Sequence, residues 1–488
     1  MPSGADLRVP EGKAGRFRAV LCGQGVLLAL LLPLAAMDPA SFADYEALIY
    51  PCCVLLLAML IWSVVSWKLV GGSLFDPYVL FLTAAAVFNG GQALLEVFHL
   101  NEGGILNGVF SSQTLFNTLY LVLISLAALH LGALISAGMA RGSDGNGGSP
   151  PHAEADTRTV GWALVMVSIV PTGIYLASCL GPVMAYGYAG FYLSAFTTGS
   201  ESIWRVLAIF LAPGALFLLA GSRGMTLNKI TAGVLLVVYS VANLFMGHRS
   251  WGAYPLLAFA WLWHRTIRPL SPRTAVILVL VMMTVLPLVA NVRSISGEER
   301  TSLASIREAF LSVGNPFVAL VAEMGGSMAA VSHTIELVPS ERGFDHGTGY
   351  ARAALTLVPS LYWGLAETYG DWLMWTVLPS AAKAGIGSAL GFSFIAEAYA
   401  NFGWVGTPVF TFVLGLLLAR LVMWAESSED VARKALMACF LVFFIAYARG
   451  ESAGEVGRLF WAAFAPYLAV VGLQRLRLRA RDGLRMHS

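Results

Sequence analysis

Residues 48–70 read LIYPCCVLLLAMLIWSVVSWKLV, and Lys68 carries the one charge in this run. An apolar run of roughly 17–25 residues is long enough to cross the hydrocarbon core of a bilayer as a helix. Similar runs recur along the chain, and we predict twelve spans, at 19–36, 48–70, 77–97, 113–137, 160–180, 203–220, 230–246, 251–263, 275–292, 403–424, 435–448 and 456–473. Two of them, 251–263 and 435–448, are short, and the count depends on them.

The composition of the whole chain supports a membrane protein. Of its 488 residues, 57% are hydrophobic and 12% are charged, whereas an average soluble domain is about 45–50% apolar and about 25% charged. This balance excludes a soluble enzyme, a disordered protein and a nucleic-acid binder. The five cysteines lie in apolar runs without metal-ligand spacing, which favours a packing role for them.

The distribution of basic residues predicts the orientation. Lys and Arg gather in a tail at 1–18, in a linker at 138–159 and in a tail at 474–488, while the short loops on the other side hold few. Cytoplasmic loops are enriched in these residues. We therefore predict that both termini are cytoplasmic, with nine spans within 19–292 and three within 403–473.

Residues 293–402 form an unusually long connection on the predicted outer face. Its apolar stretches, 309–338 and 351–382, are interrupted by charges such as Glu336 and Asp371. Each such charge at the bilayer centre costs about 2.5–3.5 kcal/mol on insertion scales. Amphipathic helices at the outer leaflet fit better. The predicted fold is thus an all-α, polytopic bundle of about twelve spans with a large outer-face loop of amphipathic helices.

Three arginines stand near outer helix ends, where the charge bias makes them unexpected. Arg249 lies in GHRS, Arg293 follows the ninth span, and Arg449 follows the eleventh. An arginine at a span end is often only an anchor in the headgroup layer. Alternatively, guanidinium forks bind phosphate oxygens bidentately, so these three are candidates for holding one anionic group.

Carboxylates and histidines supply further candidates. Glu397 and Asn401 lie four residues apart, on one face of a helix. Glu397 is either a catalytic group or a structural partner for one of the arginines. Glu323 is a charge within an apolar run, and His248 adjoins Arg249. The histidines lack ligand spacing and no nucleotide-binding glycine loop is visible, so we predict neither a metal nor a cofactor.

Residues 391–403, GFSFIAEAYANFG, resemble the signature of O-antigen polysaccharide polymerases of the Wzy type. The Ser–x–x–x–Glu–x–Tyr–x–Asn–Phe–Gly pattern of that family falls on Ser393, Glu397, Tyr399, Asn401, Phe402 and Gly403. The stretches 347–350, 322–325, 247–250 and 449–450 are similar to other elements of the family.

The resemblance implies a GT-C-like glycosyltransferase of the bacterial inner membrane that polymerises undecaprenyl-diphosphate-linked oligosaccharides at the periplasmic face. Arg249, Arg293 and Arg449 would stabilise the leaving diphosphate, and Glu397 would act as the general base, without a metal. Substrate-binding roles would fall to a further set, Tyr399, Asn401, Glu323, Tyr350 and His248. A flippase and a chain-length regulator are the expected partners, besides membrane lipids.

Two alternatives remain at this stage. An O-antigen ligase shares the donor, the membrane side and the arginine chemistry, and differs only in its acceptor. A secondary transporter or flippase would place its charges near the midplane in broken helices. The clustering of charges toward one face favours an enzyme.

Overall fold

The computed structural model describes residues 11–36, 45–140, 152–188, 190, 201–293, 295, 299, 302–312, 314–358, 368–383 and 391–486. Within these ranges every regular element is helical. Ten of the described helices are long and apolar enough to cross a membrane. The prediction of an all-α, polytopic membrane protein is confirmed.

The ten helices differ in part from the twelve predicted spans. Nine of them coincide with predicted spans, and the tenth is Pro316–Leu337, inside the predicted outer loop. The remaining predicted spans lie in α1 (Glu11–Ala36), α10 (Arg249–Thr266) and α20 (Val431–Tyr447), which are helices but are not among the ten. The last two have 18 and 17 residues and contain the two shortest predicted spans, whereas α1 has 26 residues.

Two compact units divide the chain, and each is assembled from separated stretches. Unit 1 comprises Met1–Gly145, Gly325–Gly347 and Ile395–Trp424, and unit 2 comprises the rest. Unit 1 thus holds α1, α2 (Glu46–Leu69), α3 (Pro77–Glu96), η2 (Ile105–Gly108), α4 (Ser112–Ala140), η4 (Gly325–Ser327), α14 (Met328–Leu337) and most of α19 (Phe394–Glu426).

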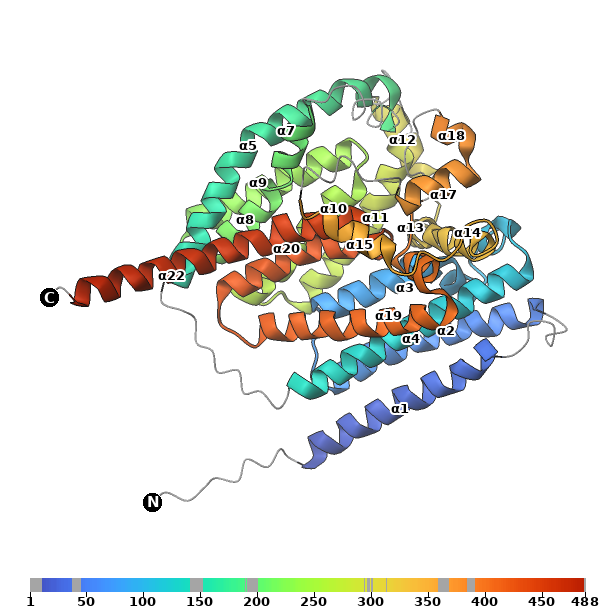
Figure 1. The fold of residues 1–488 in the computed structure, drawn as a ribbon. Coiled ribbons are helices and arrows are strands. Elements are labelled where there is room, and N and C mark those ends of the chain that lie inside the picture. The colour runs from blue at the N-terminus through green and yellow to red at the C-terminus, as the bar shows by residue number, and fades with distance from the viewer. Residues whose placement is uncertain are drawn as a thin grey trace, which may run out of the picture. The chain divides into compact units, whose positions relative to one another are not determined.

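Close approach of helices at glycines contributes to the packing of unit 1. α2 packs on α3 and α4, as the blue and cyan ribbons of Figure 1 show. α4 and α19 approach so closely that a Cβ at Gly132 would overlap the Phe412 carbonyl, and one at Gly415 would overlap the Leu129 carbonyl. In lipid, where burial between helices brings little hydrophobic gain, such small-residue contacts are a main source of helix association.

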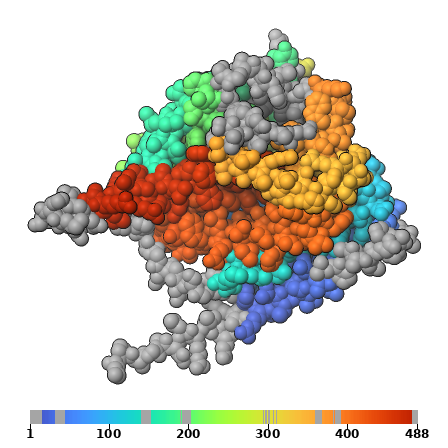
Figure 2. All heavy atoms as spheres, viewed as in Figure 1, coloured from blue at the N-terminus to red at the C-terminus, as the bar shows by residue number. Residues whose placement is uncertain are grey.

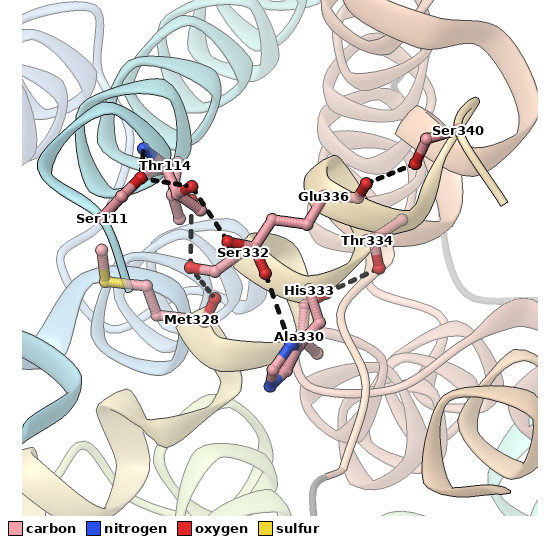
Figure 3. A network of polar contacts seen from close by, with 10 residues as sticks. Ser111, Thr114, Met328, Ala330, Ser332, His333, Thr334, Glu336 and Ser340 are labelled. Carbon is pink, nitrogen blue, oxygen red and sulfur yellow. Dashed lines mark hydrogen bonds and ion pairs between the residues drawn. The ribbon is translucent and has the colours of Figure 1, made fainter. Parts of the chain in front are cut away.

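Helix α14 is anchored to the first two turns of α4 by side-chain hydrogen bonds (Figure 3). The Thr114 hydroxyl donates to Glu336 Oε1 at 3.0 Å, and the Thr118 and Ser332 hydroxyls lie 3.0 Å apart. Gly325, just before α14, is in backbone contact with Gly91 of α3. Within unit 1, α14 therefore covers only the ends of α3 and α4 and does not follow their length.

Unit 2 is the larger unit. It contains α5 (Ala153–Tyr186), α7 (Glu201–Ala208), α8 (Leu211–Ala220), α9 (Thr226–Phe245), α10, α11 (Pro272–Val292), α12 (Leu303–Leu311), α13 (Pro316–Met324), α15 (Thr348–Leu355), α17 (Tyr369–Val377), α18 (Pro379–Lys383), α20, α21 (Ser452–Leu459), η5 (Phe460–Phe464) and α22 (Ala465–Met486). α10 and α20 pack antiparallel, since Trp251 at the start of α10 contacts Phe443 near the end of α20.

The opposite end of unit 2 is held by ion pairs. Arg265, in the last turn of α10, lies 2.7 Å from Glu426 at the end of α19. Arg477 of α22 lies 3.0 Å from Asp156 of the first turn of α5. α22, red in Figure 2, lies on the surface of the face drawn. Within unit 2, Arg265 is thus separated from Arg249 by the length of α10.

Candidate anion-binding site

Arg249 and Arg293 converge on one carboxylate in unit 2. Arg249 Nη1 donates to Glu323 Oε2 at 2.6 Å, and its Nη2 donates to Oε1, so the contact is bidentate. Arg293 Nη2 donates to the same Oε1 at 3.3 Å. The Arg249 side chain is 15% exposed and the other two are about one-third exposed. Two guanidinium groups and one carboxylate leave one positive charge in excess.

Neither Arg249 nor Glu323 stands where it would stabilise its own helix. Arg249 begins α10, and Glu323 lies in the last turn of α13. The helix dipole places partial positive charge at the N-terminal end of a helix and partial negative charge at the C-terminal end. Anions are therefore favoured at the N-terminal end and cations at the C-terminal end. The helix dipole therefore does not explain the position of either residue. Their positions bring the three charged side chains together.

Tyr188 completes the cluster from another part of unit 2. Its ring lies 5.1 Å from the guanidinium carbon of Arg293, and its N–H donates to the Arg293 carbonyl at 2.8 Å. Gly247 sits against both residues, and its φ of +91° is one that side chains rarely adopt. The tight turn between α9 and α10 is what brings His248 and Arg249 to this place.

His248 is buried beside the cluster, with its ring edge-on to Tyr188 at a centroid distance of 5.7 Å. Burial, together with the nearby charge of Arg205, lowers the pKa of His248 to about 4. The imidazole is therefore neutral at pH 7. A neutral imidazole carries one donor and one acceptor nitrogen, so His248 adds no charge to the cluster.

Arg449 lies in the turn between α20 and α21, at the same end of unit 2 as Trp251 and the start of α10. A Cβ at Gly391 would come within 3.3 Å of Arg449 Nη2, so the guanidinium lies against this glycine. The Glu451 carboxylate accepts from the N–H groups of Tyr369 and Gly370, at 2.7 and 3.0 Å. The turn that contains Arg449 and Glu451 thereby caps the N-terminal end of α17.

The Glu397 block belongs to unit 1 and is deeply buried. Glu397 and Asn401 have no exposed surface, and Tyr399 is 3% exposed. Asn401 donates to the Glu397 carbonyl at 2.8 Å, and its Oδ1 accepts from the N–H of Gly347 at 3.1 Å. α19 is broken just beyond, at Gly403, where φ is +63°.

The same block positions the loop at 338–347. The N–H groups of Asp345 and His346 donate to the carbonyls of Ala400 and Asn401, at 3.0 and 2.9 Å. Tyr399 Oη donates to the Val338 carbonyl at 3.4 Å. Tyr399 and Asn401 thus use their polar groups to hold this loop, a positioning role that spacing alone does not reveal.

The predicted residues therefore fall into two sets. Unit 2 holds Arg249, Arg293, Glu323, His248, Arg449 and Tyr350, and unit 1 holds Glu397, Tyr399 and Asn401. Within unit 2, Arg249 and Arg293 both pair with the Glu323 carboxylate. Tyr188 stands out in the sequence as one of several aromatic residues on the predicted outer face, but nothing in its spacing relates it to Arg293. Residues 141–151 of the predicted linker lie outside the described residues.

Comparison with known proteins gives one match. A family model described as O-antigen polysaccharide polymerase Wzy matches residues 26–479, nearly the whole chain. No curated protein and no solved structure matches the chain.

Proposed function

The chain belongs to the O-antigen polysaccharide polymerase Wzy family, and we propose that it joins oligosaccharide repeat units linked to undecaprenyl diphosphate at the periplasmic face. As a member of that family it is a multi-pass inner-membrane polymerase that acts on lipid-linked repeat units. The finer proposal concerns the carrier lipid, the membrane side and the residues that perform the transfer.

The cluster of Arg249, Arg293 and Glu323 is the observation that carries the proposal. Two guanidinium groups with ten N–H donors between them face one carboxylate, which is itself a planar pair of oxygens. A phosphate presents oxygens at similar spacing and carries more charge. The position of the Glu323 carboxylate therefore suits a phosphate of the donor, which would share or replace its contacts.

The proposed reaction forms one glycosidic bond and breaks one glycosyl–phosphate bond. The terminal hydroxyl of the incoming repeat unit attacks the anomeric carbon of the growing glycan. The bond from that carbon to the diphosphate oxygen breaks, and undecaprenyl diphosphate leaves with the electron pair. Arg249, Arg293 and Arg449 stabilise the negative charge that develops.

The proton of the attacking hydroxyl passes to Glu397 in this scheme. Support for this role comes from its place in the signature at 393–403. Tyr399 and Asn401 support it indirectly, by holding the loop at 338–347. Glu323, Tyr350 and His248 are proposed to orient the substrate. The scheme is GT-C-like and metal-independent, because guanidinium groups supply the countercharge.

The decisive experiment uses the purified full-length protein in nanodiscs with lipid-linked repeat units. A ladder of products differing by one repeat unit supports the polymerase. Transfer of one chain to a second lipid acceptor, without a ladder, would favour a ligase. Movement of substrate across the bilayer without new glycosidic bonds would favour a transporter and contradict the proposal.

A matched pair of substitutions tests the arginine chemistry in the same assay. Arg249→Lys keeps the charge but loses the planar fork, and we expect polymer formation to fall about 100-fold, as for loss of one stabilising donor. The control is Arg273→Lys, an exposed arginine in the first turn of α11 outside the cluster. Normal ladders from Arg249→Lys would remove bidentate recognition from the mechanism.

A further inference from the structure

An apolar groove runs along the side of unit 2, between α9 and α10. It has a volume of about 500 Å³. Gly233 forms its floor, the Phe259 and Trp263 rings form one wall, and Val237 and Lys229 stand on α9. A Cβ at Gly233 would meet only the Phe259 ring, at 3.7 Å, so there is room for a side chain at this position of the lining.

Apolar side chains are exposed beside the groove. The neighbouring side chains of α9 are about half exposed, including Ile230, Val234 and Val238. In a helix that crosses the membrane, such a strip contacts lipid tails. The lining from Thr226 to Val238 extends about 18 Å at 1.5 Å per residue, close to the depth of one leaflet, about 15 Å.

Positive charge closes one end of the groove. Lys229 Nζ donates to the Arg223 carbonyl at 3.1 Å, which leaves it two further hydrogens. Arg268 adjoins Trp263, since its N–H donates to the Trp263 carbonyl. Among the described residues, carboxylates pair with Arg223 and Arg265, whereas Lys229 and Arg268 form no ion pair. The charge beside the groove is thus uncompensated by the protein.

We propose that this groove is a binding site for an anionic phospholipid of the leaflet nearest Lys229. One acyl chain lies over Gly233 between α9 and α10, and the phosphate accepts from Lys229. An uncharged or zwitterionic lipid fits the apolar part equally well but leaves the positive end less well matched. The orientation predicted from the basic residues makes this the cytoplasmic leaflet, away from the cluster of Arg249 and Arg293.

Native mass spectrometry of the full-length protein, with defined lipids added, tests the proposal. We expect phosphatidylglycerol to be retained at least threefold more than phosphatidylethanolamine. Lys229→Gln should remove that preference, and Gly233→Leu should lower the retention of phosphatidylglycerol by filling the groove. Lys68→Gln, at the end of α2, and Gly173→Leu, exposed on α5 with no neighbour within 4 Å, are the matched controls.

Three outcomes would overturn the proposal. Equal retention of both phospholipids would remove the charge recognition. Equal losses in Gly233→Leu and Gly173→Leu would mean that the groove is ordinary lipid-contacting surface. Displacement of phosphatidylglycerol by stoichiometric undecaprenyl phosphate would assign the groove to the carrier lipid instead. None of these results depends on polymerase activity, so the proposal stands or falls separately from the function proposed above.

Discussion

The side chain of Glu323 joins two arginines that are far apart along the chain. Surface ion pairs contribute little to stability, with a median of about 0–1 kcal/mol, and this cluster is partly exposed. The cluster therefore contributes to geometry rather than to stability, because the carboxylate keeps both guanidinium groups directed at one position. A substrate phosphate that enters this place competes with the carboxylate for the same donors.

Replacing Glu323 by Gln tests that competition. We expect Glu323→Gln to bind undecaprenyl diphosphate at least threefold more tightly, because the competing negative charge is gone. Turnover should fall, because the two guanidinium groups are held less well. The measurement is inhibition of ladder formation by added undecaprenyl diphosphate, together with the initial rate.

Glu336→Gln is the control for this substitution, since Glu336 lies in the same long loop but bonds Thr114 in unit 1. Unchanged product inhibition in Glu323→Gln would mean that the carboxylate and the diphosphate do not share the site.

His248 gives the site a pH dependence whose sign follows from its buried, neutral state. Between pH 4 and 6.5 the unfolded chain binds a proton at this residue that the folded chain does not, since the folded pKa is about 4. Stability therefore falls as the pH drops from 6.5 to 4, by up to about 3 kcal/mol from this residue. We expect His248→Gln to flatten the fall in Tm over this interval, measured by thermal unfolding in detergent. A wild-type pH profile in the variant would contradict the assignment.

At the scale of single helices, breaks and close approaches matter more than apolar length. α19 changes direction at Gly403, whose φ of +63° and ψ of −161° are essentially restricted to glycine and cost other residues about 1–3 kcal/mol. The break ends the first arm of α19 with Asn401, where the helix carbonyls are free to receive the loop at 338–347. The signature at 393–403 therefore also ends the first arm of α19.

The contact of α4 with α19 yields a prediction at this scale. A methyl group at Gly132 would overlap the Phe412 carbonyl, so Gly132→Ala must separate the two helices. We expect the Tm in detergent to fall by at least about 4 °C, corresponding to roughly 1–2 kcal/mol. Gly173→Ala, where no atom lies within 4 Å, should leave the Tm unchanged. Equal Tm values for the two variants would contradict the close packing.

At the scale of the molecule, the orientation in the membrane is the central expectation. We predict that a cysteine at Glu341, exposed after α14, is labelled by an impermeant maleimide in intact spheroplasts. A cysteine at Arg268 should be labelled only after permeabilisation. A Cys22→Ala background is needed, because Cys22 is exposed whereas the other four cysteines are buried. The reverse pattern would invert the orientation and remove the periplasmic active site.

Membrane class, helical fold and most spans follow from the sequence alone. The reason is that bilayer crossing demands long apolar runs with satisfied backbone groups, a condition that composition meets locally. The signature at 393–403 is also local, and the family match over residues 26–479 agrees with it. The apolar length of a segment predicts membrane spans least well for the short spans in α10 and α20.

Only the tertiary structure decided which charges meet. Arg249, Arg293 and Glu323 come from three separate helix ends, and their convergence depends on how α10, α11 and α13 pack in unit 2. Tyr188 joins them by a backbone contact that leaves no trace in spacing. The sequence alone determined that the chain is a membrane protein, because the hydrophobicity of each segment can be read from that segment. The partner of each arginine is a property of the folded arrangement, because ion pairing depends on distances that segments acquire only when packed.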